Sequence, residues 1–140
     1  AVLMVEELAE EADFLSIGTN DLVQYILGVD RNNDQIEDLY LPHHPSILRG
    51  LKMISDASDK FNCPLSVCGN AAADPDMLEY FIGLGIKSFS IVPNMIQFVR
   101  RQINEMNYSH AKYFSKKALD AKTVKDIQEL IAKKRSKIHF

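Results

Sequence analysis

Three stretches of this chain share one pattern: a short apolar segment, a stop of small or polar residues, and then an amphipathic helix. The apolar segments begin near Asp13, Leu65 and Lys87. A short apolar run bounded by turn-forming residues is typical of a buried parallel strand. Strands that alternate with helices favour a parallel sheet with right-handed crossovers. The pattern therefore predicts an α/β fold built from three strand–helix units.

The spacing of apolar residues and the helix-capping signals place the other elements. Asn20 or Asp21 is the expected cap of a short helix that ends at Gly28, and a long polar connection follows over residues 29–44. Asp74 and Pro75 are expected to start another helix, and Thr123 the last one. The predicted helices cover 2–11, 22–28, 45–61, 75–83, 93–106, 108–119 and 123–134, and the predicted strands 13–17, 65–68 and 88–92.

Length and composition fit one globular domain. The chain has 140 residues, of which 46% are apolar and 25% charged, as in ordinary globular proteins. It contains no apolar run long enough to cross a bilayer and opens with no secretion signal, so we expect a cytosolic protein. Cys63 and Cys68 do not form a disulfide framework. A zinc site that combines them with His43 and His44 has poor spacing and is not favoured.

Charge is unevenly distributed. Residues 107–140 carry nine Lys/Arg and three Asp/Glu, a balance of +6, whereas residues 1–106 carry seven and sixteen, a balance of −9. Such a basic tail could bind RNA or a membrane surface. Because it lacks interleaved aromatic residues, we instead expect a solvated helix face beside an acidic body, with no nucleic-acid or membrane partner.

Chemically useful side chains follow the first predicted strand. In βα architectures, ligands bind at the carboxyl ends of the strands. Asn20 offers an amide, Asp21 a hard oxygen ligand, and Arg31 a fork of N–H donors. A carboxylate, an arginine and an amide together indicate a metal with an anionic substrate.

Several motifs resemble those of the phosphoenolpyruvate (PEP)-utilising enzymes, and most closely the enzyme I proteins of bacterial phosphotransferase systems. The resemblance covers nearly the whole chain. Its motifs are Gly18-Thr19-Asn20-Asp21-Leu22, Asp30-Arg31, Leu39-Tyr40 with His44-Pro45-Ser46-Ile47-Leu48, and Val67-Cys68-Gly69.

The resemblance implies a role for four side chains. Asp21 would coordinate Mg²⁺, with a helix cap as its structural alternative. Asn20 and Arg31 would hold the phosphate of PEP, although a turn residue and a surface arginine are the ordinary interpretations. Cys68, which by itself would be a small buried thiol, would protonate the enolate left after phosphoryl loss. A thiol suits that task because it titrates close enough to neutrality.

One position departs from the family pattern. The family usually has Cys-Gly-Glu, whereas this chain has Cys68-Gly69-Asn70. An amide cannot supply a proton as a carboxylic acid can, so the substitution bears on how Cys68 is tuned or reprotonated. Asp74 is retained, but it also serves as a helix cap.

The resemblance also implies the fold and the function. Residues 1–106 would be the last three βα units of a TIM (β/α)₈ barrel, which takes about 250 residues in full, and residues 107–140 a helical tail on the same domain. The chain would be the C-terminal part of a PEP–protein phosphotransferase. That enzyme moves phosphate from PEP to its own histidine and on to a small phosphocarrier protein, and it releases pyruvate.

Such a fragment would be inactive alone. The family's glutamate metal ligand, its further arginines and its phosphohistidine domain, through which the carrier protein is reached, would lie before Ala1. Two alternatives stay open: a part of pyruvate phosphate dikinase or PEP synthase, and a non-catalytic assembly module whose sheet edges associate. We expect a homo-oligomer in either case.

Overall fold

The fold is centred on a three-stranded parallel sheet. The computed structural model describes residues 1–30, 33 and 35–137. Its strands are β1 (Leu15–Gly18), β2 (Leu65–Cys68) and β3 (Ser88–Ser90), in the order β1-β2-β3. The register aligns Gly18 of β1 with Cys68 of β2, and Cys68 with Ser90 of β3. The expected α/β fold with three parallel strands is confirmed, although the first strand starts and ends later than predicted and the third is shorter.

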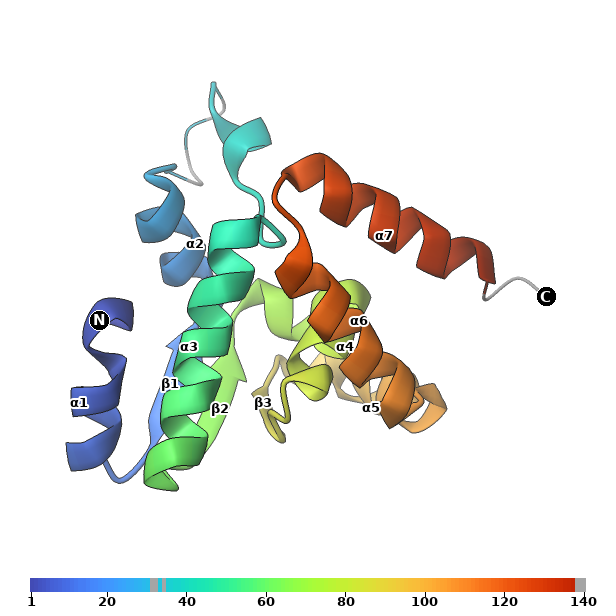
Figure 1. Cartoon of the computed structure of the whole chain (residues 1–140). Coiled ribbons are helices and arrows are strands. Elements are labelled where there is room, and N and C mark those ends of the chain that lie inside the picture. The colour runs from blue at the N-terminus through green and yellow to red at the C-terminus, as the bar shows by residue number, and fades with distance from the viewer. Residues whose placement is uncertain (31–32, 34, 138–140) are drawn as a thin grey trace.

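Helices lie beside this sheet and across one of its faces (Figure 1). The α-helices are α1 (Val5–Glu11), α2 (Thr19–Leu27), α3 (Pro45–Phe61), α4 (Pro75–Gly83), α5 (Ile96–Glu105), α6 (Tyr108–Asp120) and α7 (Val124–Lys137). Single 3₁₀ turns occur at η1 (Val2–Met4), η2 (Glu37–Leu39), η3 (Asn70–Ala73) and η4 (Pro93–Met95). None of the helices in the described part of the chain is long and apolar enough to cross a membrane.

Helix α3 has the predicted bounds because both of its ends are encoded locally. Pro45 occupies its first turn, where the missing N–H costs nothing. The Nδ1 atom of His44 accepts the backbone N–H of Ser46 and so caps the helix. Asn62 ends it in the left-handed conformation with φ of 51°, which asparagine tolerates better than most residues.

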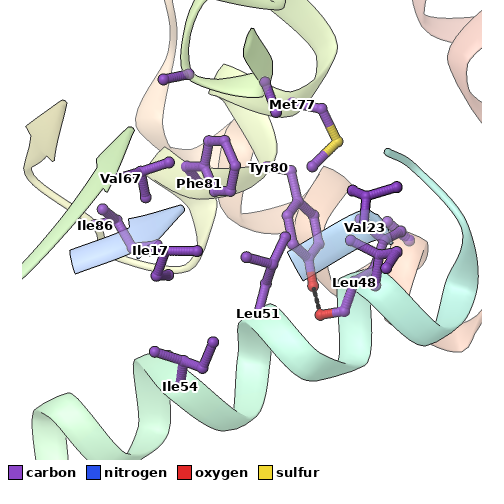
Figure 2. Close-up of a cluster of buried hydrophobic side chains, with 14 of the residues drawn as sticks. Ile17, Val23, Leu48, Leu51, Ile54, Val67, Met77, Tyr80, Phe81 and Ile86 are labelled. Atoms are coloured by element: carbon purple, nitrogen blue, oxygen red, sulfur yellow. Dashed lines mark hydrogen bonds between the residues drawn. The ribbon is translucent and has the colours of Figure 1, made fainter. Parts of the chain in front are cut away.

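The core lies between the sheet and helices α3 and α4. Figure 2 shows Ile17 of β1 and Val67 of β2 beside Phe81 of α4, with side chains of α3 below them. Tyr80 is also buried, and its hydroxyl donates a hydrogen bond of 2.7 Å to the carbonyl of Leu48. This bond connects α4 to α3 inside the core.

The N-terminal segment differs from the prediction of one helix over 2–11. It divides into η1 and α1, and only Val5 and Ala9 are buried in α1. Helical spacing predicts Val2, Val5, Leu8 and Ala9 on one side of this segment, but Leu8 is 46% exposed. It borders an apolar surface depression of about 680 Å³ that also contacts Leu15 and Tyr25.

Helix α4 begins as predicted and packs tightly on the tail. The carboxylate of Asp74 accepts the backbone N–H groups of Asp76 and Met77. Near the other end, a Cβ added to Gly83 would lie 2.2 Å from the carbonyl oxygen of Ala111 in α6. A side chain at Gly83 would therefore force α4 and α6 apart.

The last helix is held by a capping box and by ion pairs. Thr123, the expected start of this helix, and Asp126 exchange hydrogen bonds between their side chains and backbone N–H groups, which completes a capping box. Lys134 and Arg135 then reach Asp76 of α4 at 2.8 and 2.6 Å. For these two side chains, the expected proximity of the basic tail to acidic groups is confirmed.

Candidate functional site

The carboxyl ends of β1 and β2 bring the predicted site residues together. Gly18 is aligned with Cys68 in the sheet, and α2 starts at Thr19, directly after β1. Asn20 and Asp21 therefore lie in the first turn of α2, and Gly18 occupies the capping position. The prediction that Asn20 or Asp21 caps this helix was wrong, because the strand continues without a turn into the helix.

A buried hydroxyl connects α2 to the end of β2. Thr19 is only 3% exposed, and its Oγ1 donates a hydrogen bond of 2.8 Å to the carbonyl oxygen of Cys68. The next residue, Gly69, has φ of +92°. A Cβ at Gly69 would lie 2.5 Å from the Thr19 Oγ1 atom. Glycine is thus required by both the backbone conformation and the available space.

The Asn20 amide is oriented by the same segment. Its Oδ1 atom accepts the backbone N–H of Asn70 at 3.1 Å, and the backbone carbonyl oxygen of Asn20 accepts a hydrogen bond from the Tyr40 hydroxyl at 3.3 Å. This arrangement assigns the Asn20 amino group, with its two N–H donors, as the part of the side chain suited to an anionic ligand. The side chain of Asn20 thus makes a tertiary contact across 50 residues of sequence, which the alternative interpretation as a simple turn residue does not include.

Cys68 is half-buried and already has hydrogen-bond partners. Its Sγ lies 3.4 Å from the carbonyl oxygen of Ile17, which accepts the thiol proton, and 3.9 Å from the hydroxyl of Ser16. Because strand residues alternate between the two faces, Cys68 lies on the sheet face opposite to the core residue Val67. The thiol is therefore oriented away from the core and does not serve as simple core packing.

Asp21 presents an exposed carboxylate beside this edge. Within residues 1–30, 33 and 35–137, no three His, Cys, Asp or Glu side chains converge on one point. Asp21 would thus contribute a single carboxylate to a metal. Mg²⁺ is commonly held by one or two carboxylates together with substrate phosphates, so the donor chemistry here fits Mg²⁺ bound with an anionic substrate.

The remaining predicted residue, Arg31, lies outside the described residues. The structure thus brings together Asn20, Asp21 and Cys68 at one edge of the sheet. Thr19 belongs to this cluster and was not given a role from the sequence. Its sequence signals were its place in the Gly18–Leu22 motif and its position directly before Asn20, and neither reveals its partner Cys68, which is 49 residues away.

None of the histidines that the structure describes contributes to this cluster. His44 caps α3, and His43 lies half-buried in the turn before it, with a buried Nε2 atom that has no hydrogen-bond partner among the described residues. Burial lowers the pKa of His43, although the nearby carboxylates Asp74 and Asp76 oppose that effect. His110 is exposed, and His139 lies outside the described residues.

Comparison with known protein families gives the class. Residues 1–108 match the family described as "PEP-utilising enzyme, PEP-binding domain". This range includes the sheet, helices α1 to α5 and the clustered residues Asn20, Asp21 and Cys68. The chain therefore belongs to the PEP-utilising enzyme family and corresponds to its PEP-binding domain.

Individual relatives are much longer than this chain. It is 38% identical over 133 residues to the phosphoenolpyruvate-protein phosphotransferase of Listeria monocytogenes, covering 95% of this chain and 23% of that protein. It is 35% identical over 131 residues to the protein of the same name from Chlamydia trachomatis, covering 94% and 23%. A Salmonella typhimurium protein named "Phosphoenolpyruvate-dependent phosphotransferase system" is also 35% identical over 131 residues, covering 94% and 18%.

Proposed function

We propose that the chain is the C-terminal part of a PEP–protein phosphotransferase and carries one wall of its PEP site. The observation that carries this proposal is that Asn20, Asp21 and Cys68 all lie at the carboxyl edge of β1 and β2, where the Asn20 amide contacts the turn after Cys68. The relatives at 35–38% identity bear the phosphotransferase name, which favours this reading over a dikinase or a PEP synthase.

We infer that the three strand–helix units are completed to a TIM (β/α)₈ barrel by chain that is not part of this sequence. Within the described residues, β1 and β3 each pair along one edge only. Large apolar side chains are exposed near both edge strands of the sheet. Among them are Phe14 and Tyr25 near β1, and Val92 and Phe98 near β3. Neighbouring barrel units would cover these groups. Residues 1–106 would form the barrel part and 107–140 the tail.

The proposed substrate-binding groups act on the anionic end of PEP. The Asn20 amino group would donate hydrogen bonds to the phosphate, and Arg31 would add charge-assisted ones. Asp21 would hold Mg²⁺ together with the substrate. The bound Mg²⁺ would supply charge neutralisation at the transferring phosphoryl group.

Cys68 would act at the other end of the substrate. When the phosphoryl group leaves for the enzyme's histidine, an enolate of pyruvate remains. The Sγ–H bond would break as a C–H bond forms at the enolate methylene carbon, which leaves pyruvate and a thiolate. The amide side chain of Asn70 cannot return a proton to the thiolate, and its backbone N–H is already donated to Asn20. We therefore expect solvent to reprotonate the Cys68 thiolate from its exposed side.

The whole enzyme would pass phosphate to a small phosphocarrier protein through its missing N-terminal region. We also propose that the whole enzyme works in the cytosol, in sugar uptake, and as a homo-oligomer. The isolated chain would not turn over PEP, because electrostatic catalysis needs all of its charged groups at one site.

A graft tests this proposal. The chain replaces the 133-residue matching segment of the Listeria monocytogenes phosphotransferase, and two reactions are measured: histidine phosphorylation from labelled PEP, and exchange of pyruvate methyl protons with deuterated water. We expect both reactions in the graft that carries the unchanged chain. Asp21→Asn should abolish phosphorylation, whereas Cys68→Ser should lose proton exchange by a larger factor than phosphorylation.

The matched control is Asp56→Asn, which removes an exposed carboxylate on α3 that pairs with Lys52 and lies outside the site. It should leave both reactions unchanged. A folded graft that is inactive, or one in which Asp21→Asn and Asp56→Asn behave alike, would refute the proposal.

The assembly-module alternative rests on the same exposed apolar groups at the ends of the sheet. It predicts that the 140-residue chain self-associates through them, and sedimentation measurements over a range of concentrations would show this. Phe14→Ser with Val92→Ser should then dissociate the assembly. A monomeric chain would exclude this alternative.

A further inference from the structure

The structure links the proton donor of the proposed site to α2 through a residue that has no assigned role. Thr19 is buried, and its hydroxyl donates the 2.8 Å hydrogen bond to the carbonyl oxygen of Cys68. This carbonyl belongs to the peptide between Cys68 and Gly69. Because the bond fixes the orientation of that peptide, it also restricts the backbone rotation that carries the Cys68 side chain.

We propose that Thr19 is a positioning residue that holds the Cys68 sulfur in a fixed place relative to Asn20 and Asp21. This inference rests on the proposed function, since it concerns the orientation of the proposed proton donor. A proton donor must lie within hydrogen-bond reach of the reacting carbon, and small displacements in an active site cost large factors in rate.

The contact with Gly69 supports this role independently. Oγ1 of Thr19 occupies the space that a side chain at Gly69 would take, since an added Cβ would lie only 2.5 Å away. The turn after β2 is therefore packed against Thr19 as well as hydrogen-bonded to it. A hydroxyl at residue 19 fits this space and satisfies the Cys68 carbonyl at the same time.

A second contact ties the phosphate end of the site to the same turn. The Oδ1 of Asn20 accepts the backbone N–H of Asn70. A Cβ added at Gly69 would also lie 3.2 Å from this oxygen. Two consecutive residues of α2 thus hold the three-residue turn Cys68-Gly69-Asn70. The amide that would bind phosphate and the thiol that would protonate carbon are positioned by one unit.

The first test uses thiol chemistry on the 140-residue chain and needs no catalysis. Iodoacetamide labels both cysteines, and digestion with mass spectrometry gives a separate rate for each. Cys63 is 4% exposed and donates to the carbonyl of Ala12, so its rate reports global opening. Cys68 reports the turn after β2.

Thr19→Val keeps the shape of the side chain and removes the hydroxyl. We expect the Cys68 alkylation rate to rise about five-fold, the factor that corresponds to loss of one hydrogen bond of about 1 kcal/mol, with Cys63 unchanged. Thr19→Ser, which keeps the hydroxyl, should restore the original rate. The control Ser55→Ala removes a similarly buried hydroxyl that donates to the carbonyl of Leu84, and it should leave Cys68 unaffected.

The second test uses the grafted phosphotransferase. Thr19→Val should lower kcat for pyruvate methyl proton exchange about ten-fold, while KM for pyruvate stays unchanged, and Thr19→Ser should recover it. An inactive graft would refute the proposed function, whereas the alkylation rates would still judge the positioning of Cys68.

Two results would overturn the inference. One is an unchanged Cys68 alkylation rate in Thr19→Val. The other is a parallel rise for Cys63 and Cys68, because this would show that Thr19 contributes only to global stability. In the active graft, a change in KM alone would place Thr19 in substrate binding and would also contradict the inference.

Discussion

The hydroxyl of Tyr80 and the carbonyl oxygen of Leu48 are 2.7 Å apart in the middle of the core, where they join α4 to α3. Tyr80 is 1% exposed, and burial raises its pKa well above the usual value, with the charge of Asp56 adding to the effect. The phenol therefore stays neutral and acts as a hydrogen-bond donor over the whole working pH range.

Removal of this hydroxyl should destabilise the fold without changing its architecture. Tyr80→Phe loses the hydrogen bond and leaves a small void, so we expect the free energy of unfolding to fall by about 1–2 kcal/mol. Urea denaturation followed by circular dichroism measures this. Tyr113→Phe is the control, since Tyr113 is exposed on α6. Equal stability of the two variants would contradict the structural role of the Tyr80 hydroxyl.

The carboxylate of Asp76 should make the docking of α7 sensitive to acid. Burial disfavours the charged form, but hydrogen bonds and charge from Lys134 and Arg135 outweigh burial and lower the pKa of Asp76 below its ordinary 3.8. Because its pKa is lowered on folding, Asp76 contributes its full stabilisation when the pH is above its pKa in the unfolded state. This stabilisation is lost as the pH falls below about 4 toward the folded-state pKa.

Asp76→Asn should therefore reduce the free energy of unfolding by about 1–3 kcal/mol at pH 6 and by much less at pH 3. Denaturation at the two pH values gives the difference. Asp56→Asn breaks an exposed pair with Lys52 within α3, and it should cost less than about 1 kcal/mol at either pH. If Asp76→Asn cost as much at pH 3 as at pH 6, the ion pairs would not be the source of its stabilisation.

The elements that the sequence predicted best are those with local signals at both ends. Helix α3 has Pro45 at its start and an Asn62-Cys63-Pro64 break after it, and the predicted start at Pro45 and end near Phe61 are confirmed. The N-terminal helix was not, because the spacing of Val5, Leu8 and Ala9 does not reveal that Leu8 faces an uncovered surface. A pattern of apolar residues indicates which side chains avoid water but not which partner covers them.

The same distinction explains the site. The motif led to Asn20, Asp21 and Cys68, and the parallel sheet brings the ends of their strands together, as expected for βα units. The motif could not predict that the Asn20 side chain accepts a hydrogen bond from the backbone of Asn70, or that the Thr19 hydroxyl donates one to the carbonyl of Cys68. Both depend on tertiary contacts between segments about 50 residues apart.

His43 should give the protein a second pH dependence, in a higher range. Its Nε2 is buried without a partner in the described structure, and burial lowers its pKa below 6.5 despite opposing charge from Asp74 and Asp76, while His44 adds to the lowering. The folded state then binds fewer protons than the unfolded state. The contribution of neutral His43 to the free energy of unfolding is fully present above about pH 6.5. It falls as the pH decreases toward the pKa of His43 in the folded state.

His43→Leu should flatten the stability profile between pH 5 and 7, because the apolar side chain fits against neighbours such as Leu48 and Phe114 and cannot be protonated. Thermal denaturation across this range measures the slope. His110→Gln, on the exposed face of α6, should retain the slope of the original chain. An unchanged slope in His43→Leu would assign the pH dependence to other groups.

The turn after β2 can be tested by comparing Gly69 with Gly85, two glycines that have nearly the same φ but different surroundings. Gly69 has φ of +92° and Gly85 has φ of +93°. An added Cβ at Gly85 meets nothing within 4 Å, whereas at Gly69 it meets Thr19 Oγ1 at 2.5 Å. Alanine at either position carries the cost of a positive φ, about 1–2 kcal/mol, but only alanine at Gly69 also displaces Thr19.

Gly69→Ala should therefore lower the free energy of unfolding by about 1–3 kcal/mol more than Gly85→Ala does. It should also accelerate the alkylation of Cys68, because the displaced Thr19 can no longer hold the Cys68 carbonyl. Combining Gly69→Ala with Thr19→Ser removes a methyl group but keeps the clashing oxygen, so this double variant should recover little stability. Combining Gly69→Ala with Thr19→Ala removes that oxygen and should recover more. If Gly69→Ala and Gly85→Ala were equally destabilising, the close contact between Thr19 and the turn would be wrong, and only the backbone conformation would require glycine at residue 69.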